Sequence, residues 1–320
     1  MRIWAAAVFV IVAFSGQTQR STKAIGTSAI ATIPFREKAG HICVRGTISG
    51  FGALSIVIDT GVPESLLSQT IYERLKLPLT GMVNLAPGYG GRVTNPMVKT
   101  SVPSIDLGGL AVKNLAFIVI PPDYIPTMPG VEIDGILGSE LFDRYVVEID
   151  YSDKVLRFYD PTTYRKPRGG CKLPLLHRGP MPSALPLINA KIIAEEGRAV
   201  DAVLFLDTGG QVPMMLTNSF AMAHPELLKD VPSEPKQAEG VDGGVTRFRI
   251  GRVPAIRLGA CTVHDPMTAF SLDTYGMGLG GGSFSGEIGL GVFRRFTTIF
   301  DYPRGFVIFE SPTKGNSPRN

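Results

Sequence analysis

Two aspartates, each in the same short motif, are the residues best suited to chemistry in this chain. The tripeptide Asp-Thr-Gly occurs at residues 59–61 and again at residues 207–209, each time directly after three apolar residues. A single copy is compatible with an ordinary turn, since aspartate can bond the backbone ahead of it and glycine permits positive φ angles. Average residue usage gives only about 0.08 copies by chance in a chain of this length. Two copies therefore indicate a shared role.

Two carboxyl groups held at one point form an acid–base pair. Like charges a few ångströms apart cannot both ionise cheaply, so such a pair shares one proton and titrates as a unit. The ionised member can take a proton from water while the protonated member polarises a carbonyl group. We therefore predict that Asp59 and Asp207 are catalytic residues for a hydrolysis that needs neither a metal nor a covalent intermediate.

An internal repeat explains how one chain could bring the two motifs together. Residues 135–145 align with residues 286–296, and residues 56–61 align with residues 204–209. A repeat that spans nearly half of the chain indicates two homologous halves, with one motif at the matching place in each.

The composition favours strands over long polar helices, because 37 glycines and 25 prolines accompany only 19% charged residues. Short apolar runs bounded by Gly, Pro, Asp or Asn predict strands at residues 54–58, 115–120, 146–149, 203–206 and 306–309. One short helix is expected after each motif, over residues 68–77 and 218–228, with Ser68 and Asn218 as N-caps.

Paired Asp-Thr-Gly motifs within such a repeat resemble the pepsin/retropepsin superfamily of aspartic proteases, most closely the bacterial exported proteins that carry two retropepsin-like units in one chain. The resemblance covers residues 30–311. It implies an all-β, bilobal acid-protease fold with two homologous β-barrel-like lobes and short helices, and the activity of an aspartic endopeptidase. It assigns interlocking hydroxyls and turn glycines that support the dyad to Thr60, Gly61, Thr208 and Gly209.

Three positions depart from the family pattern. Its apolar-apolar-Gly element, which packs behind each aspartate, matches residues 136–138 but only partly residues 287–289, where Glu287 stands. Glu287 either faces water at a lobe edge or marks a weakened second site, because a carboxylate in a packed element needs a partner or solvent. After the motifs, Val62 crowds the first aspartate, and neither Val62 nor Gly210 offers a hydroxyl to the dyad. We therefore expect a raised dyad pKa and activity at mildly acid pH.

Family members close their cleft with glycine-bearing hairpin flaps. The candidates here are residues 87–91 and 240–244, although glycine pairs in a hairpin are equally typical of a plain turn. An extended peptide would lie between flap and dyad as an added strand. The candidate flap or substrate-binding residues are Tyr89, Gly90, Gly91, Gly243 and Gly244.

Charge and motif patterns exclude several other chemistries. A net charge of +4 without a long basic run argues against nucleic-acid binding, so no nucleic-acid partner is expected. Three cysteines without CxxC spacing allow at most one internal disulfide, and four histidines without HExxH are expected to be surface or hydrogen-bonded, so no metal is predicted. Residues 276–281 fit GxGxxG but open no predicted helix, and no cofactor is expected.

The ends of the chain and its centre carry the remaining domain predictions. An apolar run at residues 3–14 follows a basic start and would be about 18 Å long as a helix, which suits a secretory signal peptide better than a membrane span. We expect an exported periplasmic or extracellular protein whose mature chain starts between residues 16 and 21, without a later span. The predicted divisions are a signal peptide (1–19), an N-terminal lobe (20–160), an interlobe linker (161–183), a C-terminal lobe (184–311) and a polar tail (312–320).

The expected partner is a peptide or protein substrate, and the chain is expected to act as a monomer or weak dimer. The main alternative is a secreted peptide-binding protein on the same fold that is catalytically weak or inactive, an interpretation motivated by Val62, Gly210 and Glu287. An enzyme would lose its function in an Asp59→Asn variant, whereas a binder would tolerate the change.

Overall fold

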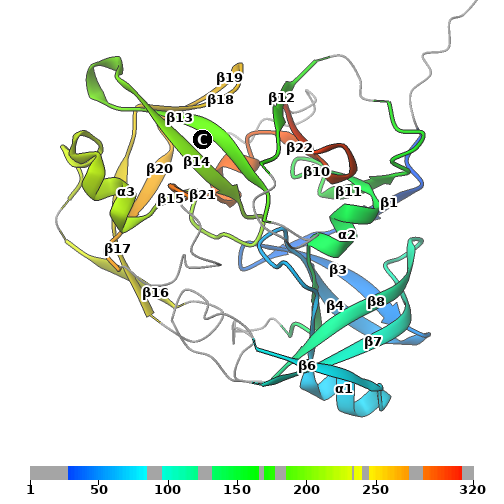
Figure 1. The fold of residues 1–320 in the computed structure, drawn as a ribbon. Helices are drawn as coiled ribbons and strands as arrows, with labels where there is room; N and C mark the ends of the chain where they lie inside the picture. Colours follow the sequence, from blue (N-terminus) through cyan, green and yellow to red (C-terminus); the bar gives the residue numbers. More distant parts are fainter. Residues whose placement is uncertain are drawn as a thin grey trace, which may run out of the picture.

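The computed structural model describes residues 28–84, 96–121, 132–165, 169–176, 185–232, 234–239, 245–273 and 284–311. These residues form three β-sheets with a few short helices at their edges (Figure 1). The predicted all-β architecture is confirmed, and each of the five predicted strands lies within an observed strand.

The first lobe is an eight-stranded sheet, in which α1 (Gln69–Leu75) follows β5. The sheet is mostly antiparallel, but its short strand β9 runs parallel to β4. In spatial order its strands are β2 (Arg36–Lys38), β3 (His41–Ile48), β4 (Phe51–Ile58), β9 (Gly135–Leu137), β5 (Leu66–Ser68), β8 (Ala111–Ile120), β7 (Met97–Asp106) and β6 (Leu79–Val83).

The second lobe repeats this plan in a nine-stranded sheet, in which β21 runs parallel to β14. Its strands, in spatial order, are β16 (Lys236–Glu239), β17 (Val245–Arg252), β20 (Met267–Ser271), β15 (Met214–Leu216), β21 (Gly286–Ile288), β14 (Ala199–Leu206), β13 (Leu187–Ile193), β18 (Ala255–Leu258) and β19 (Cys261–His264). Its helical segments are η2 (Glu195–Gly197), α3 (Asn218–Ala223) and η3 (Pro225–Leu228).

A six-stranded sheet takes strands from both halves of the chain and joins the lobes (Figure 1). Its strands are β1 (Ala31–Pro34), β11 (Val155–Tyr159), β10 (Val146–Asp150), β22 (Thr297–Asp301), β23 (Phe306–Glu310) and β12 (Cys171–Pro174). The helices beside it are α2 (Ser139–Arg144), α4 (Leu290–Phe293) and η4 (Tyr302–Arg304). At its centre β10 of the first half pairs antiparallel with β22 of the second.

The sequence repeat appears in the elements themselves. The bounds of β9, β10 and β11 recur, at one constant spacing, as those of β21, β22 and β23. The main apolar core contains residues of both lobes, and at its centre the Phe142 ring lies 5.4 Å from both the Phe300 and the Tyr302 rings. Each such ring contributes about 2 kcal/mol by leaving water, so the lobes share a continuous core.

The two short helices behind the motifs form where the sequence predicts them, but one cap differs. Ser68 caps α1, because its Oγ accepts a hydrogen bond from the Ile71 N–H at 3.3 Å. The prediction of Asn218 as the second N-cap is wrong: Thr217 has the extended backbone of a cap and accepts from the Phe220 N–H at 3.2 Å. The helix then ends before Pro225, since the residue before a proline is pushed out of helical geometry.

In the part of the chain that the structure describes, no helix is long and apolar enough to cross a membrane. The predicted signal peptide and the polar tail beyond residue 311 lie outside the described residues.

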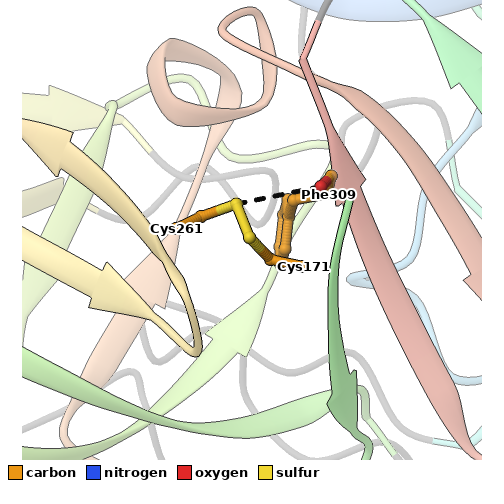
Figure 2. The surroundings of a disulfide bond; sticks show 3 residues. All are labelled: Cys171, Cys261 and Phe309. Atoms are coloured by element: carbon orange, nitrogen blue, oxygen red, sulfur yellow. Dashed lines mark hydrogen bonds between the residues drawn. A yellow bond between two sulfur atoms is a disulfide. The ribbon is translucent and has the colours of Figure 1, made fainter. Parts of the chain in front are cut away.

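One disulfide joins the shared sheet to the second lobe. Figure 2 shows Cys171 of β12 bonded to Cys261 of β19, beside the carbonyl oxygen of Phe309. Cys43 is buried and carries a free thiol. The segment predicted as an interlobe linker therefore includes an edge strand, β12, which pairs with β23 and carries one half of the disulfide.

Candidate active site

Each aspartate of the two motifs directly follows a central strand. Asp59 follows β4 and Asp207 follows β14, and a short parallel strand lies beside each of these. The backbone N–H of Asp59 donates to the carbonyl oxygen of Leu137 at 3.0 Å, and that of Asp207 donates to the carbonyl oxygen of Ile288 at 2.9 Å. The apolar-apolar-Gly position thus holds the backbone of both aspartates, including the lobe where the sequence match is only partial.

The two threonines lock the motifs together across the lobes. The Thr60 N–H donates to Thr208 Oγ1 at 3.0 Å, and the Thr208 N–H donates to Thr60 Oγ1 at the same distance. The Thr60 hydroxyl also donates to the carbonyl oxygen of Leu206 at 2.7 Å. Both threonines are completely buried. This is the interlocking arrangement that the resemblance implies for Thr60 and Thr208.

Removing one of these hydroxyls should weaken the lobe interface. We expect Thr60→Val to lower the free energy of unfolding by about 3 kcal/mol, because it leaves the Thr208 N–H and the Leu206 carbonyl buried without their partner. Thr60→Ser keeps the hydroxyl and should cost only about 1 kcal/mol. Urea unfolding of both variants measures the difference, and equal midpoints would show that the hydroxyl is dispensable.

Backbone N–H groups orient the two carboxylates. The Gly61 N–H donates to Asp59 Oδ1 at 2.7 Å, and the Gly209 N–H donates to Asp207 Oδ1 at 2.8 Å. The two carboxyl groups lie close together, since a Cβ at Gly61 would lie 2.5 Å from Asp207 Oδ1 and 3.0 Å from Asp59 Oδ1. Each aspartate keeps 9% of its surface exposed, so the pair lies just below the molecular surface.

Each turn glycine lies against the aspartate of the other lobe. A Cβ at Gly61 would lie 2.5 Å from Asp207 Oδ1, and one at Gly209 would lie closer still to the Asp59 carboxylate. The space above these glycines is therefore occupied by the carboxyl pair, and this close approach excludes any side chain. The structure thus places the predicted supporting glycines, Gly61 and Gly209, directly against the two predicted catalytic aspartates.

Burial and neighbouring charge act strongly on Asp207. Burial raises the pKa of Asp207 well above its usual range, and the charges of Asp59 and Glu287 raise it further, against the opposing hydrogen bond from the Gly209 N–H. Asp207 therefore keeps its proton at pH values where a solvent-exposed aspartate is ionised.

Glu287 does not face water, so that interpretation of the sequence was wrong. Its side chain is 2% exposed, in β21, which lies between β14 and β15 in the interior of the sheet. In the strand register Glu287 lies opposite Phe205 on one side and Met215 on the other. Both faces of this short strand are covered, since Gly286, Glu287 and Ile288 are all buried.

The residues that follow the motifs serve the turn and its packing. Val62 packs against an apolar cluster that includes Cys43, Val57 and Ile136. The Gly210 N–H donates to the Asp207 carbonyl oxygen at 3.2 Å, and the Gly210 carbonyl oxygen accepts from the Leu290 N–H at 2.9 Å. The backbone of this turn is thus bonded to both the motif and α4.

His41 is a residue of the site that the sequence did not single out. It is 5% exposed, its Nε2 lies 3.2 Å from the side-chain nitrogen of Gln211, and its buried Nδ1 has no hydrogen-bond partner in the described structure. Burial lowers the pKa of His41, while the charge of Asp59 acts in the opposite direction. The expectation of a surface or fully hydrogen-bonded histidine is therefore wrong here, because strand pairing carries His41 into the interior.

The candidate flap residues Tyr89, Gly90, Gly91, Gly243 and Gly244 lie outside the described residues. The described strands on either side of each candidate pair with one another, β6 with β7 and β16 with β17, both antiparallel. Among the described residues, no group of three or more His, Cys, Asp or Glu side chains is arranged to hold a metal ion.

Comparisons with known proteins give a family match and a similar fold. A family model described as aspartyl protease matches residues 44–141, which contain the first motif. The fold is similar to the crystal structure of an aspartic proteinase from Irpex lacteus, with a TM-score of 0.57 and 14% sequence identity over 91% of this chain and 99% of that chain. No curated protein matches the sequence significantly. The family match over residues 44–141 and the similar fold support the resemblance to the pepsin/retropepsin-like aspartic proteases.

Proposed function

We propose that this chain is an aspartic endopeptidase that hydrolyses peptide bonds with a water molecule activated by Asp59 and Asp207. The observation that carries the proposal is the pair of adjacent carboxyl groups, each held by the N–H of its own motif glycine. The raised pKa of Asp207 supports it further, because a dyad must keep one proton to work as acid and base together.

In this mechanism the ionised carboxylate takes a proton from the water, whose oxygen then bonds to the carbon of the scissile carbonyl. The protonated carboxyl group donates its proton to the carbonyl oxygen, and a tetrahedral diol forms. When the diol collapses, the C–N bond breaks, the leaving nitrogen receives the proton taken from water, and a diol hydroxyl returns its proton to the dyad. Every proton is returned, so no metal and no covalent intermediate is needed.

The proposal also covers the compartment in which the protein works and its oligomeric state. The Cys171–Cys261 disulfide supports export, because disulfides persist mainly in oxidising compartments such as the periplasm and the extracellular space. Both aspartates and both threonines come from the same chain, which supports an active monomer. The substrate is a peptide or protein bound in extended form, as an added strand along the dyad.

The decisive test is hydrolysis of a mixed peptide library by the purified mature chain, from about pH 3 to pH 8, with and without pepstatin. An Asp207→Asn variant serves as the matched control. Cleavage that disappears in the variant supports the dyad mechanism, and the cut sites then define the specificity. Cleavage that persists in the variant would rule the mechanism out.

The two turn glycines allow a second test of the same proposal. We expect Gly209→Ala to reduce kcat/KM by at least about 100-fold, because the new Cβ displaces the Asp59 carboxylate and a shift of about 1 Å costs that much. Gly81→Ala is the control, since the nearest atom to a Cβ there is 4.0 Å away. A Gly209→Ala enzyme with unimpaired turnover would show that the close approach is not required.

The alternative function is a peptide-binding protein with weak or no turnover. The buried carboxylate of Glu287 beside Asp207 is the observation that favours it, since a third negative charge departs from a simple dyad. Library peptides that bind unchanged at every pH, with equal affinity in an Asp59→Asn variant, would establish this alternative. Cleavage by the wild-type chain excludes it.

A further inference from the structure

The first aspartate has a histidine as its strand neighbour. In the antiparallel pair of β3 and β4, Ile42 lies opposite Ile58 and Cys43 opposite Val57. Continuing that register by one residue places His41 beside Asp59, and the alternation of side chains puts both on the face that carries Cys43 and Val57. The electrostatic interaction between His41 and Asp59 agrees with this placement.

The second aspartate has a carboxylate as its neighbour instead. Leu204 and Leu206 of β14 enter the main core, so Phe205 and, two residues on, Asp207 turn to the opposite face. Glu287 lies opposite Phe205 in the parallel register of β14 and β21, and its flanking residue Ile288 enters the core. Glu287 is therefore on the same face as Asp207, and its charge acts on that carboxyl group.

The equivalent positions of the opposite lobes carry no ionisable group. Because Leu187 pairs with Phe205, the position beside Asp207 that corresponds to His41 is Leu185. The position that corresponds to Glu287 in the first lobe is Ile136, opposite Val57. The two lobes thus differ in a complementary way: a base stands beside one aspartate and an acid beside the other.

We propose that His41 and Glu287 together favour one protonation state of the dyad, in which the single proton resides on Asp207 and the negative charge on Asp59. When protonated, the His41 imidazolium favours a negative charge on the adjacent Asp59, whereas the Glu287 carboxylate opposes a second negative charge at Asp207. His41 and Glu287 are then positioning residues for the proton. This inference rests on the proposed function, in which it makes Asp59 the base that accepts a proton from water and Asp207 the acid.

The remaining ionisable groups around the dyad do not oppose this assignment. Tyr151 and Tyr302 interact with both aspartates, but burial raises the pKa of each phenol above its usual value, so both stay neutral. Glu37, which interacts with Tyr151, forms an ion pair with Arg294. The two described ionisable neighbours that differ between Asp59 and Asp207 are therefore His41 and Glu287.

Each neighbour should control one limb of the pH profile. Activity requires a dyad with one proton, so it falls at high pH when Asp207 loses that proton and at low pH when the pair gains a second one. Glu287→Gln removes the charge that keeps Asp207 protonated, and we expect the alkaline limb to move down by about one pH unit. His41→Leu removes the group that favours charge on Asp59, and we expect the acid limb to move up by about the same amount.

The experiment measures kcat/KM against pH for the wild type, Glu287→Gln and His41→Leu. Glu287→Ile and His41→Gln provide second variants in case the first do not fold. Isoleucine and leucine already occupy the equivalent positions of the opposite lobes, which favours the folding of Glu287→Ile and His41→Leu. Ile136→Val is the control that alters packing at the position equivalent to Glu287 without changing charge. The proposal is supported if Glu287→Gln moves only the alkaline limb, His41→Leu moves only the acid limb, and the control moves neither.

A uniform loss of turnover at every pH, with both limbs unmoved, would overturn the proposal and leave these residues a purely structural role. A second readout does not depend on catalysis: carbon-13 NMR titration of the aspartate carboxyl groups. We expect one late-titrating signal that is absent in Asp207→Asn and moves to lower pH in Glu287→Gln. A late signal that disappears in Asp59→Asn instead would overturn the assignment, whereas an inactive wild type that still shows the Asp207 signal would count against the proposed function alone.

Discussion

Replacing either aspartate with asparagine is expected to reduce kcat/KM by roughly 10³- to 10⁴-fold, and replacing both is expected to reduce it no further. The two carboxyl groups lie close together and, in the proposed mechanism, share one proton, so they act as a unit and either loss removes the whole function. Single-turnover and steady-state measurements on Asp59→Asn, Asp207→Asn and the double variant test this. Effects that multiply in the double variant would mean that the aspartates act independently.

The same variants should separate activity from stability. Because the folded-state pKa of Asp207 is raised, the native protein binds a proton that the unfolded chain releases, and stability is lost as pH rises through that folded-state pKa. Asp207→Asn has no such proton to lose. We therefore expect this inactive variant to be more stable than the wild type at neutral pH and to lose that advantage in acid. Thermal melting at both pH values measures the change, and a destabilised variant at neutral pH would contradict the raised pKa.

Reducing the disulfide is expected to lower the free energy of unfolding by roughly 4 to 5 kcal/mol. Cys171 and Cys261 are 90 residues apart, and opening a loop of that length releases a large conformational entropy in the unfolded chain. Domains of this kind are typically stable by only about 5–15 kcal/mol, so the loss would be a large part of the total. The destabilised region would be the junction of β12 and β19, between the shared sheet and the second lobe.

The measurement is urea unfolding of the wild type with and without reductant, beside the double variant Cys171→Ser, Cys261→Ser. Cys43→Ala is the matched control, because that buried thiol is outside the disulfide and its loss should leave the response to reductant unchanged. A wild type whose midpoint does not respond to reductant would show that the second lobe is held by its core packing alone.

The sequence predicts a large part of the fold because the relevant signals are local or repeated. Short apolar runs bounded by Gly, Pro, Asp or Asn predict the strands β4, β8, β10, β14 and β23, and a single hydroxyl at Ser68 predicts the start of α1. The second helix shows the limit of such signals. Thr217 and Asn218 are both good caps, and the choice depends on backbone geometry and on the Asn218 amide, which bonds the Ser271 carbonyl oxygen of another strand.

Part of the candidate site could likewise be predicted from the sequence, and part of it could not. Asp59 and Asp207 were predicted from the sequence alone, because a motif that recurs at matching places of a repeat must be brought to matching places of the fold. Their threonine and glycine neighbours followed from the same motif. The pairing of Cys171 with Cys261 was open, since three cysteines allow several pairs and only the positions of β12 and β19 select one.

What only the tertiary structure decided is the environment of the dyad. His41 lies in a different strand from Asp59, and no sequence pattern marks it as part of a site. Glu287 stands out in the sequence as a departure from the apolar-apolar-Gly element, but the sequence does not show which way its side chain points. Their positions depend on the register between strands, where a shift of one residue would turn each side chain to the opposite face. Amino-acid types and spacing thus determined which groups do the chemistry, and the strand register determined which neighbours set their charge.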